Sequence, residues 1–115
     1  ARACIGQGAS ACIETDGGVT TIGMIQCHDQ ERAAWRALRD GFVDSLRRRE
    51  SAAQISMLDE TLAAHARWTN VRCAYGASIY EGGSMARVLA AACANRLEAE
   101  LAIDLRSRLA EYDER

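Results

Sequence analysis

Two cysteines placed almost symmetrically about a pair of glycines constrain this chain more than any other feature. Cys73 precedes Gly82 and Gly83, Cys93 follows them at a nearly equal separation, and the residues on both sides have helical periodicity. Adjacent glycines allow a chain to reverse, so a bond between the two thiols would join two antiparallel helices across a tight turn. Because such bonds persist in oxidising compartments, the pattern predicts an exported protein.

Three further cysteines lie in the N-terminal part of the chain. Closure of a short loop favours a bond between Cys12 and Cys27, which leaves Cys4 unassigned. A bridge from Cys4 to either of these two cysteines is an alternative. A lipid anchor on Cys4 is a less favoured alternative, because lipidation signals usually place a leucine three residues before the cysteine, where this chain has Ala1.

The first residues, Ala1-Arg2-Ala3-Cys4, are similar to the small-x-small sequence found near a signal peptidase cut. We therefore expect a mature chain that is periplasmic or secreted after removal of a signal peptide. No stretch reaches the roughly 18 apolar residues that a membrane-spanning helix needs.

The composition is that of a single helical domain, which we expect to cover residues 1–115. The chain has no proline and 5% aromatic residues, and its alanine, leucine and arginine residues favour helices over sandwiches or barrels. The net charge is −2, and the basic run Arg47 to Arg49 is bounded by Asp44 and Glu50. This is too little positive charge for nucleic-acid binding.

Apolar residues spaced by threes and fours predict three amphipathic helices, at about 21–49, 52–79 and 84–111. The glycine-rich segment 1–19 is expected to be an irregular loop with at most one short helical turn. Each apolar stripe needs a partner, so the predicted all-α fold is a small antiparallel three-helix bundle with a disulfide-tied N-terminal segment.

Each predicted helix has an expected cap and an expected buried stripe. The caps are Thr20 or Thr21, Ser51 and Ser84. The stripes comprise Met24, Cys27, Glu31, Trp35, Leu38, Phe42 and Leu46 in the first helix, Ile55, Leu58, Leu62, His65, Trp68 and Tyr75 in the second, and Met85, Val88, Leu89, Ala92, Cys93, Leu97, Leu101, Leu105 and Leu109 in the third.

The sequence contains no recognisable catalytic constellation. The serines lack a histidine and acid at a suitable spacing, and Asp59-Glu60 has no second acid at a recognisable distance. The cysteines are expected to be oxidised. Cys27-His28 is the one element that suggests a metal, and it lacks the further ligands that zinc requires. We therefore expect no enzyme activity, no cofactor and no metal site.

Two stretches of the sequence resemble one family. The first comprises Thr21, Met24, Cys27, Glu31 and Trp35. The second is longer and comprises Cys73, Ser78–Met85, Cys93, Arg96-Leu97, Glu100 and Leu105. Together they span most of residues 12–109 and are similar to the LprI-type lysozyme-inhibitor domain of exported bacterial proteins.

The chain departs from that family at several positions. Where members usually have an aspartate and, further on, a Leu-Asn pair, this chain has Arg36 and Arg39-Asp40. Where members usually have a tryptophan and an Arg-Asp step, it has His65, Thr69 and Asn70. These substitutions remove an acid and a salt-bridge arginine, and they leave the implied fold intact.

The resemblance implies an exported bacterial protein that binds and blocks a lysozyme. The expected contact is the hairpin, through Tyr80, Glu81 and Ser84, because a rigid turn loses little entropy on binding. Two of these residues also have plain structural roles, since Ser84 would cap the third helix and Tyr80 would cover the hairpin end. The alternative function is a cell-envelope structural or interaction domain without inhibitory activity, which the substitutions at Arg36 and His65 favour.

Overall fold

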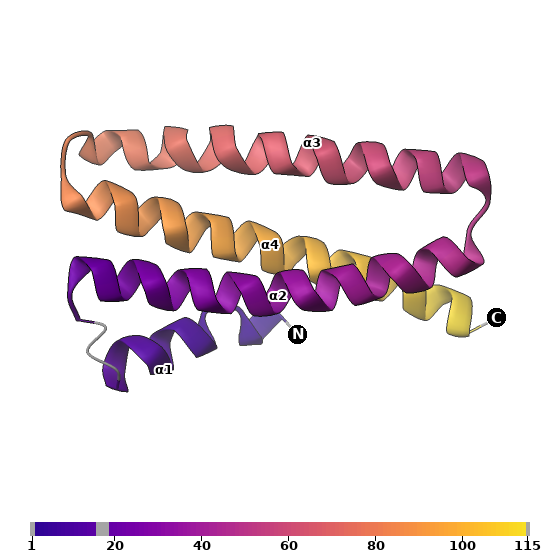
Figure 1. The fold of residues 1–115 in the computed structure, drawn as a ribbon, viewed down its shortest axis with the longest axis horizontal. Coiled ribbons are helices and arrows are strands. Elements are labelled where there is room, and N and C mark those ends of the chain that lie inside the picture. Colours follow the sequence, from indigo (N-terminus) through magenta and orange to yellow (C-terminus); the bar gives the residue numbers. More distant parts are fainter. Residues whose placement is uncertain (1, 16–18, 115) are drawn as a thin grey trace.

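The computed structural model describes residues 2–15 and 19–114 of the chain. Every regular element in these ranges is a helix, which confirms the predicted all-α class (Figure 1). The elements are a 3-10 turn η1 (Arg2–Cys4), α1 (Gln7–Thr15), α2 (Thr21–Arg49), α3 (Ala52–Ala77), a second 3-10 turn η2 (Ser78–Tyr80) and α4 (Ser84–Asp113). The Cα atoms span 47 × 28 × 17 Å. None of the described helices combines the length and apolar character needed to cross a membrane.

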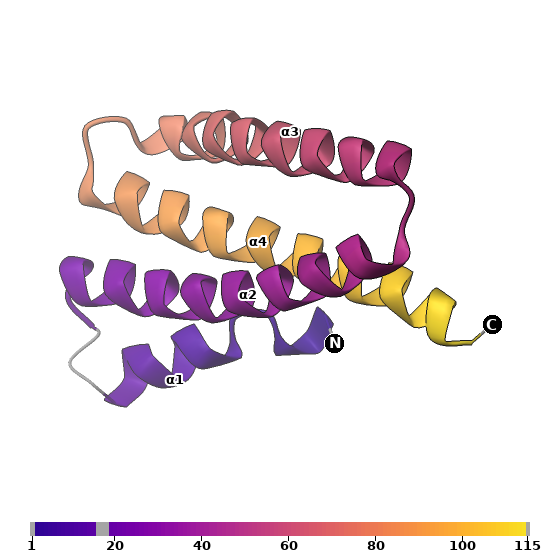
Figure 2. The ribbon, with the colours of Figure 1, turned by 45° about the vertical axis from the view of Figure 1, so that its right-hand side comes forward.

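Helix α4 lies at the centre of the molecule. It packs along α2 and, on another side, against α3, whereas α3 makes at most marginal contact with α2 (Figure 2). The middle of α4 is buried on most sides, as expected for a helix between two neighbours. The predicted three-helix bundle is therefore confirmed only as an all-α packing of helices, because a further helix adds to the three long ones. Four α-helices are described, and they pack in the succession α1, α2, α4 and α3.

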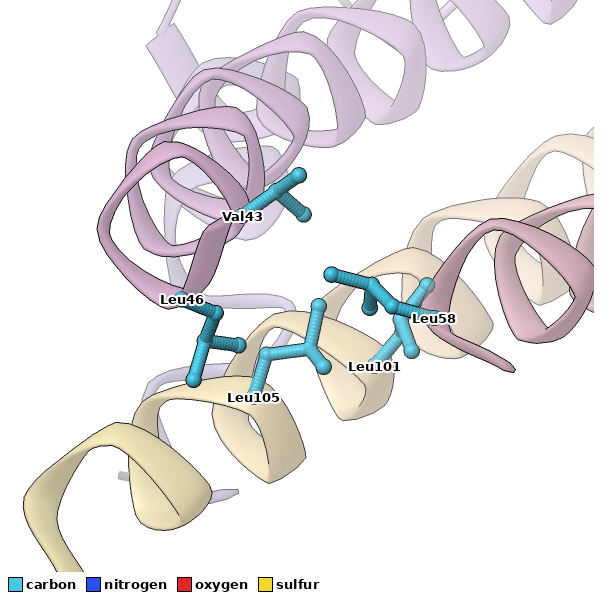
Figure 3. Close-up of a cluster of buried hydrophobic side chains, with 5 residues drawn as sticks. All are labelled: Val43, Leu46, Leu58, Leu101 and Leu105. Carbon is cyan, nitrogen blue, oxygen red and sulfur yellow. The ribbon is translucent and has the colours of Figure 1, made fainter. Parts of the chain in front are cut away.

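The larger of two apolar clusters lies at the end of the molecule where α2 connects to α3. The cluster is formed by Val43 and Leu46 of α2, Leu58 of α3, and Leu101 and Leu105 of α4 (Figure 3). Leu46 has no exposed surface, and the other four residues are each 7% exposed. Burial of one such side chain contributes about 2 kcal/mol, so the cluster anchors α3 to both other long helices at this end.

Side-chain caps fix the beginnings of α2 and α3. The Thr20 hydroxyl accepts a hydrogen bond from the Gly23 amide at 3.0 Å. Ser51 and Gln54 form a reciprocal capping box with bonds of 3.2 and 2.9 Å. Both caps agree with the predicted helix starts, and the bounds of the three long helices differ from the predicted ranges by no more than two residues.

The start of α4 corrects one prediction. Gly83 rather than Ser84 occupies the N-cap position, and no side chain caps the helix. Gly82 has a positive φ of 82°, and the Gly83 amide donates to the Tyr80 carbonyl at 2.9 Å. The turn that the glycines form therefore ends one residue earlier than the capping pattern indicated.

The N-terminal segment corrects a second prediction. The segment expected to be an irregular loop contains the nine-residue helix α1. Two long-range interactions hold this helix. They are the disulfide between Cys12 and Cys27 and the Glu31 carboxylate, which accepts hydrogen bonds from amides at the start of α1. The Gly17-Gly18 loop, which the Cys12–Cys27 bond was expected to close onto the first long helix, lies outside the described residues.

Several residues assigned to buried stripes are exposed. The exposed fractions are 51% for Leu38, 56% for Trp68 and 78% for Tyr75, and Met85 and Leu89 are 47% and 37% exposed. The residues on α3 are exposed because α4 is the one described helix against which α3 packs extensively. Periodicity identifies residues that share a face, but burial also requires a second helix to cover that face.

Candidate functional site

A disulfide bond holds the hairpin between α3 and α4. Cys73 and Cys93 are bonded, with their Cα atoms 5.5 Å apart. Cys73 is buried and packs with Ala94 and Leu97 in a small apolar cluster. Because α3 packs extensively only on α4 within the described chain, this bridge and this cluster fix the hairpin half of α3.

Backbone hydrogen bonds and two glycines set the shape of the turn. The Glu81 amide donates to the Ser78 carbonyl at 3.1 Å, and the Gly83 amide donates to the Tyr80 carbonyl at 2.9 Å. The positive φ of Gly82 is one that glycine adopts readily. A Cβ atom on Gly83 would lie only 3.2 Å from the Tyr80 carbonyl oxygen. The turn therefore presents its side chains on a backbone with little freedom.

The residues expected to contact a partner lie together at this turn. Tyr80 is 50% exposed, and Glu81 and Ser84 are exposed beside it. Exposed apolar side chains flank them in the chain, of which Tyr75 and Ile79 are 78% and 79% exposed. We call the hairpin surface the set Tyr75, Ile79, Tyr80, Glu81, Ser84 and Met85.

The apolar part of the hairpin surface was not expected from the sequence. Periodicity places Tyr75 and Met85 on buried stripes, yet both are exposed. One feature of the sequence could have indicated this exposed apolar surface. Ile79 and Tyr80 are adjacent, and adjacent residues of a helix do not lie on the same face. At least one large apolar side chain had to point to solvent at this end.

A second cluster ties the N-terminal arm, residues 2–15, to α2 and α4. The Glu31 carboxylate of α2 accepts hydrogen bonds from the Gly6 amide at 2.8 Å and from the Ala9 amide at 3.0 Å. It also accepts from the Trp35 indole at 3.0 Å and from the Asn95 side-chain amide at 2.6 Å. Glu31 thus serves as the N-cap of α1 from another helix and places a negative charge at its positive end.

The pKa of Glu31 lies below its ordinary value of 4.5. Burial by itself would raise this pKa. The hydrogen bonds from Ala9, Asn95, Gly6 and Trp35 stabilise the charged carboxylate and outweigh that effect. These hydrogen bonds therefore favour the ionised form of the Glu31 carboxylate.

The stability that Glu31 contributes should depend on pH. A carboxyl group whose pKa is lowered by folding stabilises the protein above its unfolded pKa and loses this contribution as the pH falls through its folded pKa. We expect the difference in free energy of unfolding between wild type and Glu31→Gln to be largest above pH 4.5 and to shrink in more acid solution. Urea unfolding at a series of pH values measures it, and a difference that grows on acidification would contradict the expectation.

A third polar cluster lies between α2 and α4, at positions where the chain carries unusual residues. Glu98 is 2% exposed and accepts hydrogen bonds from Arg39 Nη1 at 2.8 Å and from Arg36 Nε at 3.3 Å. A buried carboxylate needs such compensation. His65 links α3 to α4, because its Nε2 lies 3.1 Å from the Leu97 carbonyl oxygen. Arg36, Arg39 and His65 therefore have structural partners of their own.

The N-terminal cysteines comprise one bridge and one free thiol. Cys12 and Cys27 are bonded with their Cα atoms 5.6 Å apart, and Cys4 is free and exposed. Since Cys27 is in a disulfide, it has no thiolate to offer a metal. Among the residues that the structure describes, no three histidine, cysteine or acidic side chains come together as a metal site requires.

Comparison with known proteins gives one match. A protein-family model described as Lysozyme inhibitor LprI matches residues 12–105. No curated protein and no solved structure matches the chain significantly. The matched range contains both disulfides, the Glu31 carboxylate and the hairpin surface.

Proposed function

This chain belongs to the LprI family of lysozyme inhibitors, and on that basis we propose that it binds a lysozyme through the hairpin surface and blocks the enzyme. Tyr80, Glu81 and Ser84 make the direct contacts, and the exposed apolar side chains of Tyr75, Ile79 and Met85 complete the interface. We propose a periplasmic or secreted location, with which the two disulfides are compatible.

The composition and rigidity of the hairpin surface support this role. Tyr75 and Tyr80 offer large amphipathic side chains, and tyrosine is enriched among the residues that dominate binding energy at interfaces. The backbone hydrogen bonds of the turn and the nearby disulfide restrict the backbone, so binding orders few additional degrees of freedom. Glu81 adds a carboxylate that a basic partner can contact.

The charges near the hairpin complement both kinds of surface on a lysozyme. Lysozymes of the common animal type are basic proteins with carboxylates in their substrate cleft. Glu81 can therefore face the basic outer surface, while the exposed Arg87, one turn of α4 beyond Ser84, faces the cleft. Between residues 65 and 97, Glu81 is the one acidic residue.

Removing two side chains of the hairpin surface should weaken inhibition. We expect Tyr80→Ala/Glu81→Ala to require at least about tenfold more protein for half-maximal inhibition, because an aromatic and a charged contact are both lost. The measurement is the turnover of a cell-wall substrate by several types of lysozyme. The matched control is Met57→Ala/Glu60→Ala, which removes an exposed apolar and an exposed acidic side chain from the other half of α3.

Two outcomes of this assay would contradict the proposal in different ways. Equal inhibition by wild type and by the hairpin variant would exclude the hairpin surface from the contact. Absence of inhibition by wild type, together with no retention on immobilised lysozyme, would exclude the inhibitory function itself. The second outcome favours the alternative of a cell-envelope interaction domain with another partner.

A further inference from the structure

A groove of about 490 Å³ lies beside the bond between Cys73 and Cys93. Its walls come from the N-terminal arm, α2, α3 and α4, and its lining includes Ile5, His28, Arg72, Leu89, Asn95 and Arg96. We call it the bridge groove. None of the residues proposed to contact lysozyme lines it, so the bridge groove is distinct from the hairpin surface.

The charged side chains of the bridge groove are two arginines. Arg72 extends along α3 across Gly76, where a Cβ atom would lie 2.7 Å from Arg72 Nη1. Arg96 lies one turn of α4 beyond Cys93, and its ion pair with Glu100 is long at 3.5 Å. No aspartate or glutamate is among the described residues that line the groove. The positive charge of the groove therefore favours an anionic ligand.

The remaining walls of the bridge groove suit a peptide. Ile5 and Leu89 contribute apolar surface next to the disulfide. Asn95 is 1% exposed and uses its amide nitrogen to bond Glu31, while its Oδ1 has no hydrogen-bond partner among the described residues. His28 Nδ1 is likewise without a described partner. Buried polar atoms are rarely left in this way, and a peptide N–H is the kind of donor that Asn95 Oδ1 lacks.

From these observations we propose that the bridge groove binds an acidic peptide segment of a partner protein. One carboxylate of the segment pairs with Arg72 and a second with Arg96, because guanidinium groups bind carboxylates through paired, charge-assisted hydrogen bonds. An apolar side chain between the two carboxylates contacts Leu89. The proposal stands apart from lysozyme inhibition, since different residues carry it.

The test is an NMR titration of the full chain with the synthetic probe N-acetyl-Asp-Leu-Asp-amide. We expect saturable binding to wild type, and at least about tenfold weaker binding to Arg72→Gln/Arg96→Gln, because both charge-assisted contacts are lost. The control Arg67→Gln/Arg87→Gln removes the same charge from exposed positions outside the groove. It should bind within about twofold of wild type, since exposed charges at a distance are screened by salt.

A second probe, N-acetyl-Asn-Leu-Asn-amide, has the same shape without the charge and should bind at least about tenfold more weakly than the acidic probe. Absence of saturable binding of the acidic probe to wild type would overturn the proposal. Equal binding of the two probes would overturn it too, because carboxylates would not be recognised. An equal loss in both double variants would show general charge attraction and would also overturn it. Unchanged amide spectra of the free variants establish that the loss does not come from unfolding.

Discussion

Replacing Glu31 with alanine should lower the free energy of unfolding by about 4 kcal/mol, because four donors lose a shared acceptor and each unpaired buried donor costs about 1–3 kcal/mol. Two of these donors are the amides of Gly6 and Ala9, and the other two are the Trp35 indole and the Asn95 side-chain amide. Urea unfolding at neutral pH with both disulfides intact measures the loss. Such a loss is a large part of the roughly 5–15 kcal/mol that stabilises a typical domain.

The effect of Glu31→Ala should be concentrated in the N-terminal arm. Hydrogen exchange at the amides of Gly6 and Ala9 should accelerate, because their acceptor is gone, while the cluster around Leu46 keeps its protection. The matched control is Glu14→Ala, which removes an exposed acid of α1 and should change stability by less than about 0.5 kcal/mol. An equal loss of unfolding free energy in the two variants would show that the Glu31 carboxylate stabilises the fold no more than an exposed acid does.

The long helices could be predicted closely because their signals are local. Thr20 and Ser51 cap amides within their own first turn, and the apolar periodicity continues over many residues. Helix α1 could not be predicted in this way, because its cap is the Glu31 carboxylate, 25 residues from Gly6 in the sequence. A contact at that separation depends on how α2 packs against the arm, which a local pattern does not contain.

In the candidate site, too, the features set by local sequence could be predicted and those set by packing between helices could not. The glycines of the hairpin identified a turn, and a turn places Tyr80 and Glu81 at the surface. The exposure of Tyr75 could not be inferred, because it depends on α3 having one extensive neighbour in the described chain. The ion pair between Arg39 and Glu98 was also beyond a local pattern, since 59 residues separate the two side chains. The periodicity therefore predicts the helices, whereas the packing between them determines which residues are exposed to a partner.

Removing the bond between Cys73 and Cys93 should destabilise the protein by about 3 kcal/mol through the lost constraint on the unfolded chain. The bond joins residues 20 apart in the sequence. In the folded chain, the cluster that anchors α3 to α2 and α4 lies around Leu58, at the opposite end of the molecule. The variant Cys73→Ala/Cys93→Ala therefore leaves the hairpin half of α3 held by a small apolar cluster. Urea unfolding measures the loss, and hydrogen exchange should accelerate at residues 75–85.

The other disulfide supplies the matched control for this prediction. Cys12→Ala/Cys27→Ala removes a bond between residues 15 apart, so a similar global loss of about 3 kcal/mol is expected, with faster exchange confined to the N-terminal arm. Faster exchange of the arm in the hairpin variant, or an unchanged unfolding midpoint, would show that Cys73–Cys93 is not the tie that fixes the hairpin. The two variants should also differ in lysozyme inhibition. Only the loss of Cys73–Cys93 loosens the backbone that presents Tyr80, and binding must then supply the ordering that the bond now provides.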